Sequence, residues 1–180
     1  MCLMIGAFIY LGSKNYNQNN IPKNKETLAT YYKSLDNNNV FKIYKNTEAA
    51  KFMDSGTGII LFCIKSSEWC DYYAAIVNEV AKELNIKEIY FFDILSDRDT
   101  NSYYYSKIIT KTKDYLTKDD TGKVSLITPD IYVLNNGVIL GHNNESSAVP
   151  AISTPKTYWN EESLNALKIE LRNLFSKLEK

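Results

Sequence analysis

The sequence predicts an α/β fold in which a central mixed β-sheet carries helices on both faces. The continuous apolar run Ile59–Ile64 is typical of a strand buried on both faces. A helical repeat over Trp69–Leu84 and a second apolar strand within Lys87–Leu95 follow it. One helix between two strands makes a right-handed parallel β-α-β unit the default. Two apolar runs around Asn135-Asn136-Gly137 predict an antiparallel hairpin, which makes the sheet mixed.

Shorter elements are expected around this unit. Alternating side chains in Asn39–Lys45 predict a strand before the central one, and Asp97–Thr100 is expected to be a polar loop. Helices are expected at residues 25–35, at Thr47–Asp54 with Thr47 as its cap, at Asn101–Leu116, and after Asn160, which caps the last helix. Pro129 must open the hairpin's first strand or lie at a sheet edge, because proline cannot donate a ladder hydrogen bond.

The composition excludes several classes of function. Lysine plus arginine and aspartate plus glutamate number 21 each, so no net positive field exists to attract nucleic acid. Three cysteines without metal-site spacing and a single histidine, His142, cannot make up a zinc site. The odd cysteine count also argues against a disulfide framework. We expect a monomer with no metal, no cofactor and no nucleic-acid partner.

The N-terminus differs in composition from the rest of the chain. Its first eleven residues are apolar, and the polar stretch that follows has the composition of a tether, so residues 1–24 stand apart from a folded domain at residues 25–180. The apolar run is shorter than the roughly 20 residues that span a bilayer, and it lacks the basic start and cleavage site of a signal peptide. We expect residues 1–12 to belong to an export signal or membrane anchor; the alternative is an apolar strand or helix.

The stretch Ser66-Ser67-Glu68-Trp69-Cys70 is the candidate site. It joins the central strand to the following helix, and an aromatic residue next to a cysteine at such a junction is a common setting for thiol chemistry. That chemistry normally uses two cysteines three residues apart, and this stretch contains one.

The chain from Asn39 to Lys180 resembles the thioredoxin family, and in particular the thioredoxin-like proteins of Gram-positive bacteria that are labelled bacteriocin-transport accessory proteins. Four features carry the resemblance: the buried strand ending in Phe62, Trp69-Cys70 at a helix start, Thr128-Pro129 before the hairpin, and Asn135-Asn136-Gly137 as its turn. The resemblance implies a thioredoxin fold with its cysteine motif at the start of the helix.

Two registers are possible for that motif. Cys70 matches either the first cysteine of the family's CxxC, giving Cys70-Asp71-Tyr72-Tyr73, or the second, giving Ser67-Glu68-Trp69-Cys70. The family places its first cysteine five residues beyond a buried phenylalanine, and five residues beyond Phe62 is the serine. Apolar and acidic residues after the family's second cysteine are matched by Ile76-Val77 and Glu79-Val80-Ala81. Both flanks select a degenerate SxxC motif.

This motif predicts weakened redox chemistry. A serine hydroxyl does not ionise at a helix N-terminus as a thiol does, so we expect Ser67 to cap the helix. Cys70, one turn further in, is expected to be buried and is either a small core residue or a slowly reacting thiol. Glu68 would oppose a nearby thiolate, and Leu61 stands where many thioredoxins hold a buried acid.

Cys63 and His142 are the other residues whose side chains could take part in chemistry, and both are expected away from the motif. Cys63 lies on the central strand with no evident reason to face Cys70, so we expect a core residue that is not bridged to it. His142 follows the hairpin turn, and we expect it to be partly exposed at a sheet edge and remote from Ser67.

The resemblance also implies a peptide-binding groove. In the family, the residue before a cis-proline offers its backbone to an extended peptide, and an aromatic residue beside the cysteines covers one side. Thr128, Pro129 and Trp69 match these positions, with Glu68 beside the aromatic residue, and Asn144–Ser147 should return to the same end of the sheet. A cis Thr128–Pro129 bond is therefore expected. The alternative is that Pro129 only starts a strand and Trp69 is a surface aromatic residue.

Two functions are compatible with these features. The first is an extracytoplasmic, secreted or membrane-tethered accessory module that binds a protein or peptide and cannot cycle disulfides. The second is a thiol–disulfide oxidoreductase, or monothiol enzyme, that acts through Cys70. A cytoplasmic location is the alternative to the extracytoplasmic one.

Overall fold

A computed structural model describes residues 26–118, 122, 124–144 and 153–179. It contains a five-stranded sheet in the order β1-β3-β2-β4-β5. The strands are β1 (Phe41–Ile43), β2 (Gly58–Cys63), β3 (Ile89–Asp93), β4 (Asp130–Asn135) and β5 (Val138–Asn143). β1, β3 and β2 are mutually parallel, whereas β4 is antiparallel to β2 and β5 to β4. The mixed sheet and its parallel β-α-β unit are confirmed.

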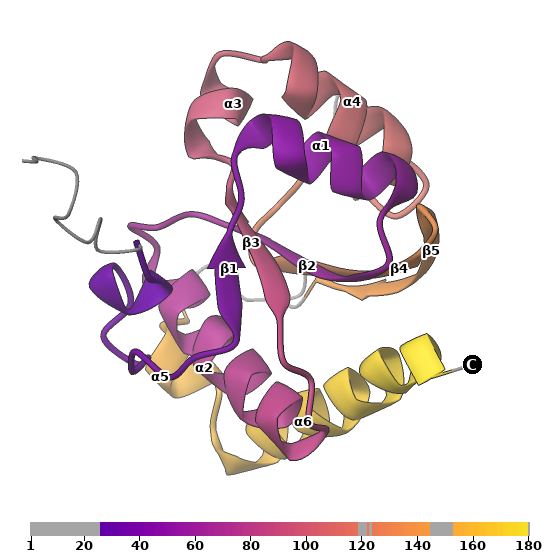
Figure 1. Ribbon diagram of the computed structural model, residues 1–180. Helices are drawn as coiled ribbons and strands as arrows, with labels where there is room; N and C mark the ends of the chain where they lie inside the picture. Colours follow the sequence, from indigo (N-terminus) through magenta and orange to yellow (C-terminus); the bar gives the residue numbers. More distant parts are fainter. Residues whose placement is uncertain (1–25, 119–121, 123, 145–152, 180) are drawn as a thin grey trace, which may run out of the picture.

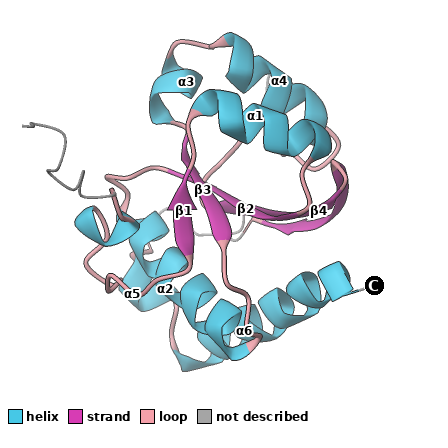
Figure 2. Cartoon of the chain, viewed as in Figure 1, coloured by secondary structure: helices cyan, strands magenta, loops and turns pink. Residues whose placement is uncertain are grey.

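Helices cover both faces of the sheet (Figure 1). One face carries α1 (Asn46–Ser55), α3 (Leu95–Asp99) and α4 (Tyr103–Thr112), and the other carries α2 (Glu68–Glu83), α5 (Pro155–Tyr158) and α6 (Glu161–Phe175). Single 3₁₀ turns lie at Leu28–Thr30 and Ser176–Glu179. Figure 2 shows the resulting layers of helix, sheet and helix. The strand order, the hairpin that a cis-proline opens and the C-terminal helix together make this the expected thioredoxin fold.

The central strand β2 divides its side chains between two cores. Ile59, Leu61 and Cys63 pack on the face that α2 and α6 cover, whereas Ile60 and Phe62 pack on the face that α1 and α4 cover. All five side chains are at most 1% exposed. Successive side chains of a strand point to opposite faces, so the odd-numbered residues of β2 contact one core and the even-numbered residues contact the other.

Three local predictions were wrong. The expected helix at residues 25–35 is a single 3₁₀ turn in the described part, although Leu28, Tyr32 and Leu35 are buried. The expected loop Asp97–Thr100 is largely the end of helix α3, because the carboxylate of Asp97 is buried and accepts hydrogen bonds from Asn46 and Ser102. Helix α1 begins at Asn46 instead of behind a Thr47 cap; the backbone N–H of Lys45 donates to Glu48 at 2.8 Å.

The apolar N-terminal segment, residues 1–24, lies outside the described residues. Within the described ranges, no helix is both long and apolar enough to cross a membrane.

Gly137 permits a close approach between the hairpin turn and α1. Its φ of +74° favours glycine, and its N–H donates to the carbonyl of Gly56 at 2.8 Å. A Cβ at this position would lie 2.0 Å from the carbonyl oxygen of Asp54. The turn therefore packs backbone against backbone, which leaves no room for a side chain.

We expect Gly137→Ala to lower the free energy of unfolding by roughly 3 kcal/mol, because left-handed strain and a backbone clash add. Urea denaturation measures the change. Gly122→Ala is the matched control, since Gly122 also has a positive φ, +81°, but open space around it. An equal loss in the two variants would contradict the role of the close approach.

Candidate active site and peptide groove

Ser67 is the N-cap of α2, as expected. Its Oγ accepts a hydrogen bond from the backbone N–H of Cys70 at 3.4 Å, and its backbone is extended. Glu68 is exposed in the first turn, and Ser67 is half-buried. The hydroxyl therefore serves the helix, and no described residue positions a base against it.

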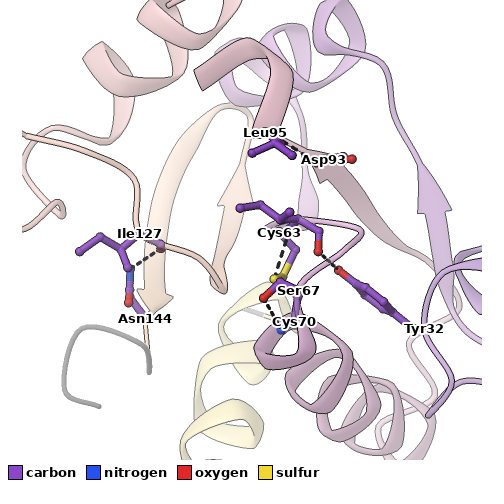
Figure 3. Close-up of a disulfide and its surroundings, with 9 residues drawn as sticks. Tyr32, Cys63, Ser67, Cys70, Asp93, Leu95, Ile127 and Asn144 are labelled. Atoms are coloured by element: carbon purple, nitrogen blue, oxygen red, sulfur yellow. Dashed lines mark hydrogen bonds between the residues drawn. A yellow bond between two sulfur atoms is a disulfide. The ribbon is translucent and has the colours of Figure 1, made fainter. Parts of the chain in front are cut away.

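Cys63 and Cys70 form a disulfide, so the prediction that they are not bridged was wrong (Figure 3). Cys63 is the last residue of β2 and points to the face that α2 covers, and Cys70 points down onto the same face from the first turn of α2. Their Cα atoms are 5.8 Å apart, within the range that a disulfide requires. The alternation along β2, in which Cys63 shares a face with Leu61, was only a partial signal in the sequence, because it does not show which way Cys70 points.

Both cysteines are inaccessible. Each has 0% of its surface exposed, and the backbone N–H of Ile64 lies 3.2 Å from the Sγ of Cys70. Leu61, in place of the family's buried acid, is also fully buried on this face. The pair therefore lacks both a solvent-exposed sulfur and an acid at the position of Leu61 that could transfer a proton to it.

A segment before β1 fixes the loop between Cys63 and Cys70. Tyr32 is 1% exposed, and its hydroxyl donates to the carbonyl of Ile64 at 3.0 Å (Figure 3). Burial raises the pKa of Tyr32, so its phenol stays a donor. The backbone N–H groups of Lys33 and Ser34 donate to the carboxylate of Asp71 at 3.2 and 3.0 Å. Nothing in the sequence distinguished these residues, because the contacts join segments more than thirty residues apart.

A pocket of about 460 Å³ lies between this segment and the start of α2. Its lining mixes polar and apolar surface, and it includes Tyr31, Lys65, Ser67, Glu68 and Asp71. Lys65 is held by an ion pair with Glu26 at 2.7 Å and by the ring of Tyr31, 4.2 Å away. The charge of Lys65 is thus neutralised within the protein.

The Thr128–Pro129 bond is cis, as expected. The antiparallel register pairs Phe62 with Asp130, which brings Pro129 beside the end of β2 that carries Cys63. Thr128 is half-buried and Ile127 is 39% exposed, so the backbone before the proline borders solvent. The structure thus places the expected groove residues and the cysteine pair at the same end of the sheet.

The segment after β5 also returns to this end. The side-chain amide of Asn144 donates to the carbonyl of Ile127 at 2.8 Å (Figure 3). The rest of the expected rim, residues 145–147, lies outside the described residues. Asn144 therefore ties the end of β5 to the backbone before the cis-proline.

Trp69 is not a free surface aromatic residue. Its ring is half-buried and packs edge-on against Tyr158 at 5.7 Å and Trp159 at 5.3 Å, with Tyr72 and Tyr73 against the second tryptophan. These contacts come from α5 and the residue after it, a stretch that carries no motif with a functional meaning. They fix the ring between the start of α2 and the α5 stretch.

A buried carboxylate follows the cis-proline and was not anticipated. Asp130 is 0% exposed, and its oxygens lie 2.8 Å from the hydroxyl of Tyr132 and 3.2 Å from Nδ1 of His142. Burial raises the pKa of Asp130, and the hydrogen bonds from these partners act against that rise. His142 lies on the edge strand with a quarter of its side chain exposed, as expected.

No group of side chains among the described residues is arranged to hold a metal ion. The site is therefore made up of a helix cap, a buried disulfide, a cis-proline and an aromatic cluster.

Comparisons with known proteins give a distant likeness. No protein-family model and no curated protein sequence matches the chain. Among solved structures, thioredoxin O2 from Arabidopsis thaliana in the oxidised state has 14% identity and a TM-score of 0.43, covering 76% of this chain and 96% of that one. Thioredoxin O1 from the same organism has 17% identity and a TM-score of 0.41, covering 76% and 99%. The fold rests on the topology described above, and these values assign no activity.

The disulfide should be measurable. We expect one reactive thiol per unfolded, unreduced chain and a Cys63–Cys70 peptide in a non-reducing digest. Because the bridge closes a short loop, oxidised protein should exceed a Cys63→Ala/Cys70→Ala variant in unfolding free energy by about 2–3 kcal/mol.

Dithiothreitol should remove most of that difference, and Cys2→Ala is the control that should leave it unchanged. A stability gap that is independent of reductant would indicate lost packing without a bond.

Proposed function

We propose that this protein is a thioredoxin-like, extracytoplasmic accessory module that binds an extended segment of a protein or peptide at its cis-proline and does not cycle disulfides. The observation that carries the proposal is the replacement of the family's nucleophile by a helix-capping serine, Ser67, with the remaining cysteine of the motif, Cys70, buried in a disulfide. Binding then depends on the backbone around Thr128 and on the ring of Trp69.

Loss of the nucleophile supports binding over catalysis. Disulfide exchange starts with attack by an accessible thiolate, and both Cys63 and Cys70 are fully buried. Ser67 borders the pocket, and its Oγ accepts a hydrogen bond from the N–H of Cys70. Within the described ranges, no base is bonded to this hydroxyl to activate it. The binding features need no ionised sulfur.

The disulfide also supports a location outside the cytoplasm, because such bonds persist in oxidising compartments and are rare where thiols are kept reduced. A tether through residues 1–12 fits that location. The resemblance to bacteriocin-transport accessory proteins suggests a partner among exported peptides or their exporter.

A second function, thiol–disulfide oxidoreductase, is favoured by one observation: two cysteines lie within bonding distance at the site end of β2 and α2. In that case the Cys70 thiolate attacks a substrate disulfide and releases one substrate thiol. The Cys63 thiolate then attacks Cys70, releases the second substrate thiol and re-forms the Cys63–Cys70 bond. A dithiol reductant must restore the pair, and local opening must expose the sulfurs.

Insulin reduction in dithiothreitol separates the two functions. We expect the wild-type protein and Cys63→Ala to give no turnover above the dithiothreitol background. The double variant Cys63→Ala/Ser67→Cys should gain turnover, because it restores a nucleophile at the helix N-terminus and frees Cys70 to resolve. Wild-type turnover that is lost in Cys70→Ala would instead establish the oxidoreductase.

Binding is tested with S-carboxymethylated insulin B chain, an extended probe that cannot exchange disulfides. When the probe is added, the largest NMR chemical-shift changes of the protein should be those of Thr128, Trp69 and their neighbours. Ile127→Glu should weaken binding roughly tenfold, since it places a charge beside the peptide's path. The control Val138→Glu changes an equally apolar residue, 62% exposed, at the opposite end of the sheet. Equal effects of the two variants, or no binding by the wild type, would contradict the proposed groove.

A further inference from the structure

Asp130 connects the groove to the edge strand. We call Ile127–Pro129 the arm; it leads directly into β4, whose first residue is Asp130. The carboxylate of Asp130 lies on the sheet face that α1 and α4 cover, and the disulfide lies on the opposite face. His142, the penultimate residue of β5, lies against one carboxylate oxygen. Asn144 reaches both the carboxylate and the carbonyl of Ile127. The arm is thus held from both of its ends by one short stretch of β5 and the residue after it.

The carboxylate depends on donors supplied by these neighbours. A fully buried charge is costly unless it is hydrogen-bonded, and an ionised carboxylate only accepts. The hydroxyl of Tyr132 donates to one oxygen, and an ionised Asp130 requires Nδ1 of His142, 3.2 Å from the other oxygen, to carry a hydrogen and donate it. The side chain of Asn144 completes the set.

Few other titratable groups adjoin this pair within the described ranges. Tyr132 stacks on the imidazole with ring centroids 5.3 Å apart, and Tyr115, which follows α4, meets the same ring edge-on at 5.1 Å. Thr112 of α4 bonds to Tyr132, and Phe62 of β2 lies opposite Asp130; both are uncharged. The carboxylate therefore meets two titratable donors, the phenol of Tyr132 at 2.8 Å and the imidazole of His142 at 3.2 Å.

We propose that His142 and Asp130 form a positioning pair for the peptide groove: the imidazole N–H holds the buried carboxylate, and through it the arm, in the peptide-binding conformation at neutral pH. This proposal rests on the proposed binding function. It adds His142 of β5 as a positioning residue that does not itself contact the peptide.

The pair predicts a pH dependence of definite sign. Burial raises the pKa of Asp130, so the docked arm stabilises the protonated carboxyl relative to the ionised one. The free energy of docking the arm is therefore least favourable when Asp130 is ionised. The donated N–H of His142 is therefore needed above the pKa of Asp130 and matters little below it. A residue that contributed packing alone would have the same effect at every pH.

The test measures binding of S-carboxymethylated insulin B chain to four variants across the acid and neutral range. His142→Ala should weaken binding roughly tenfold at neutral pH, and the loss should disappear below the pKa of Asp130. His142→Asn, which retains an N–H near the same place, should recover most of the affinity. In the Asp130→Asn background, His142→Ala should have little effect, because no buried charge remains. A loss that is constant with pH, or that persists in that background, overturns the pair.

A second readout does not need the peptide. The ¹³C resonance of the Asp130 carboxyl should titrate above the pKa of an ordinary aspartate, about 3.9, and His142→Ala should move the midpoint upward. The amide resonance of Thr128 should follow the same curve. If the wild type does not bind the probe, the proposed function fails while this titration still decides the pair; a Thr128 resonance that ignores the ionisation of Asp130 overturns it.

Discussion

The bond between Cys63 and Cys70 is the constraint on which the site depends. It joins the last residue of the central strand to the first turn of α2, and so fixes where the helix begins over the sheet. Ser67 caps that helix and Trp69 projects from its first turn, so the positions of both follow from the same bond. In the family pattern, the corresponding helix start carries a reactive thiol; here Ser67 caps the helix and the Cys63–Cys70 bond ties its first turn to β2.

The segment before β1 and the stretch around α5 complete the site from two sides. Tyr32 and the backbone of Lys33 and Ser34 hold the loop and the first turn of α2, while Trp159 packs against Trp69. The cis-proline lies at the same end, with Asp130 buried beneath it on the far face. Support by packed residues on several sides would preorganise the binding surface proposed around Thr128 and Trp69.

Sequence patterns predicted the parts of the molecule that local chemistry decides. The buried strand ending at Cys63, the Ser67 cap and the Asn-Gly turn each leave a signal within a few residues, whereas the cis Thr128–Pro129 bond was expected from the family resemblance. The disulfide did not follow from the sequence, because no local pattern shows that Cys63 and Cys70, seven residues apart, face the same core between β2 and α2. The Asp130–His142 contact and the docking of Tyr32 depend on register between distant segments, which one sequence does not encode in any short pattern.

Burial of Leu28 and Tyr32 has a consequence for where the folding unit begins. The family resemblance starts at Asn39, yet these two side chains are at most 1% exposed and belong to the core beneath α2. A fragment cut at the start of the resemblance would lose large apolar side chains from the core and leave the carbonyl of Ile64 and the carboxylate of Asp71 without these donors. The packed core of this chain therefore begins before the segment that resembles the family.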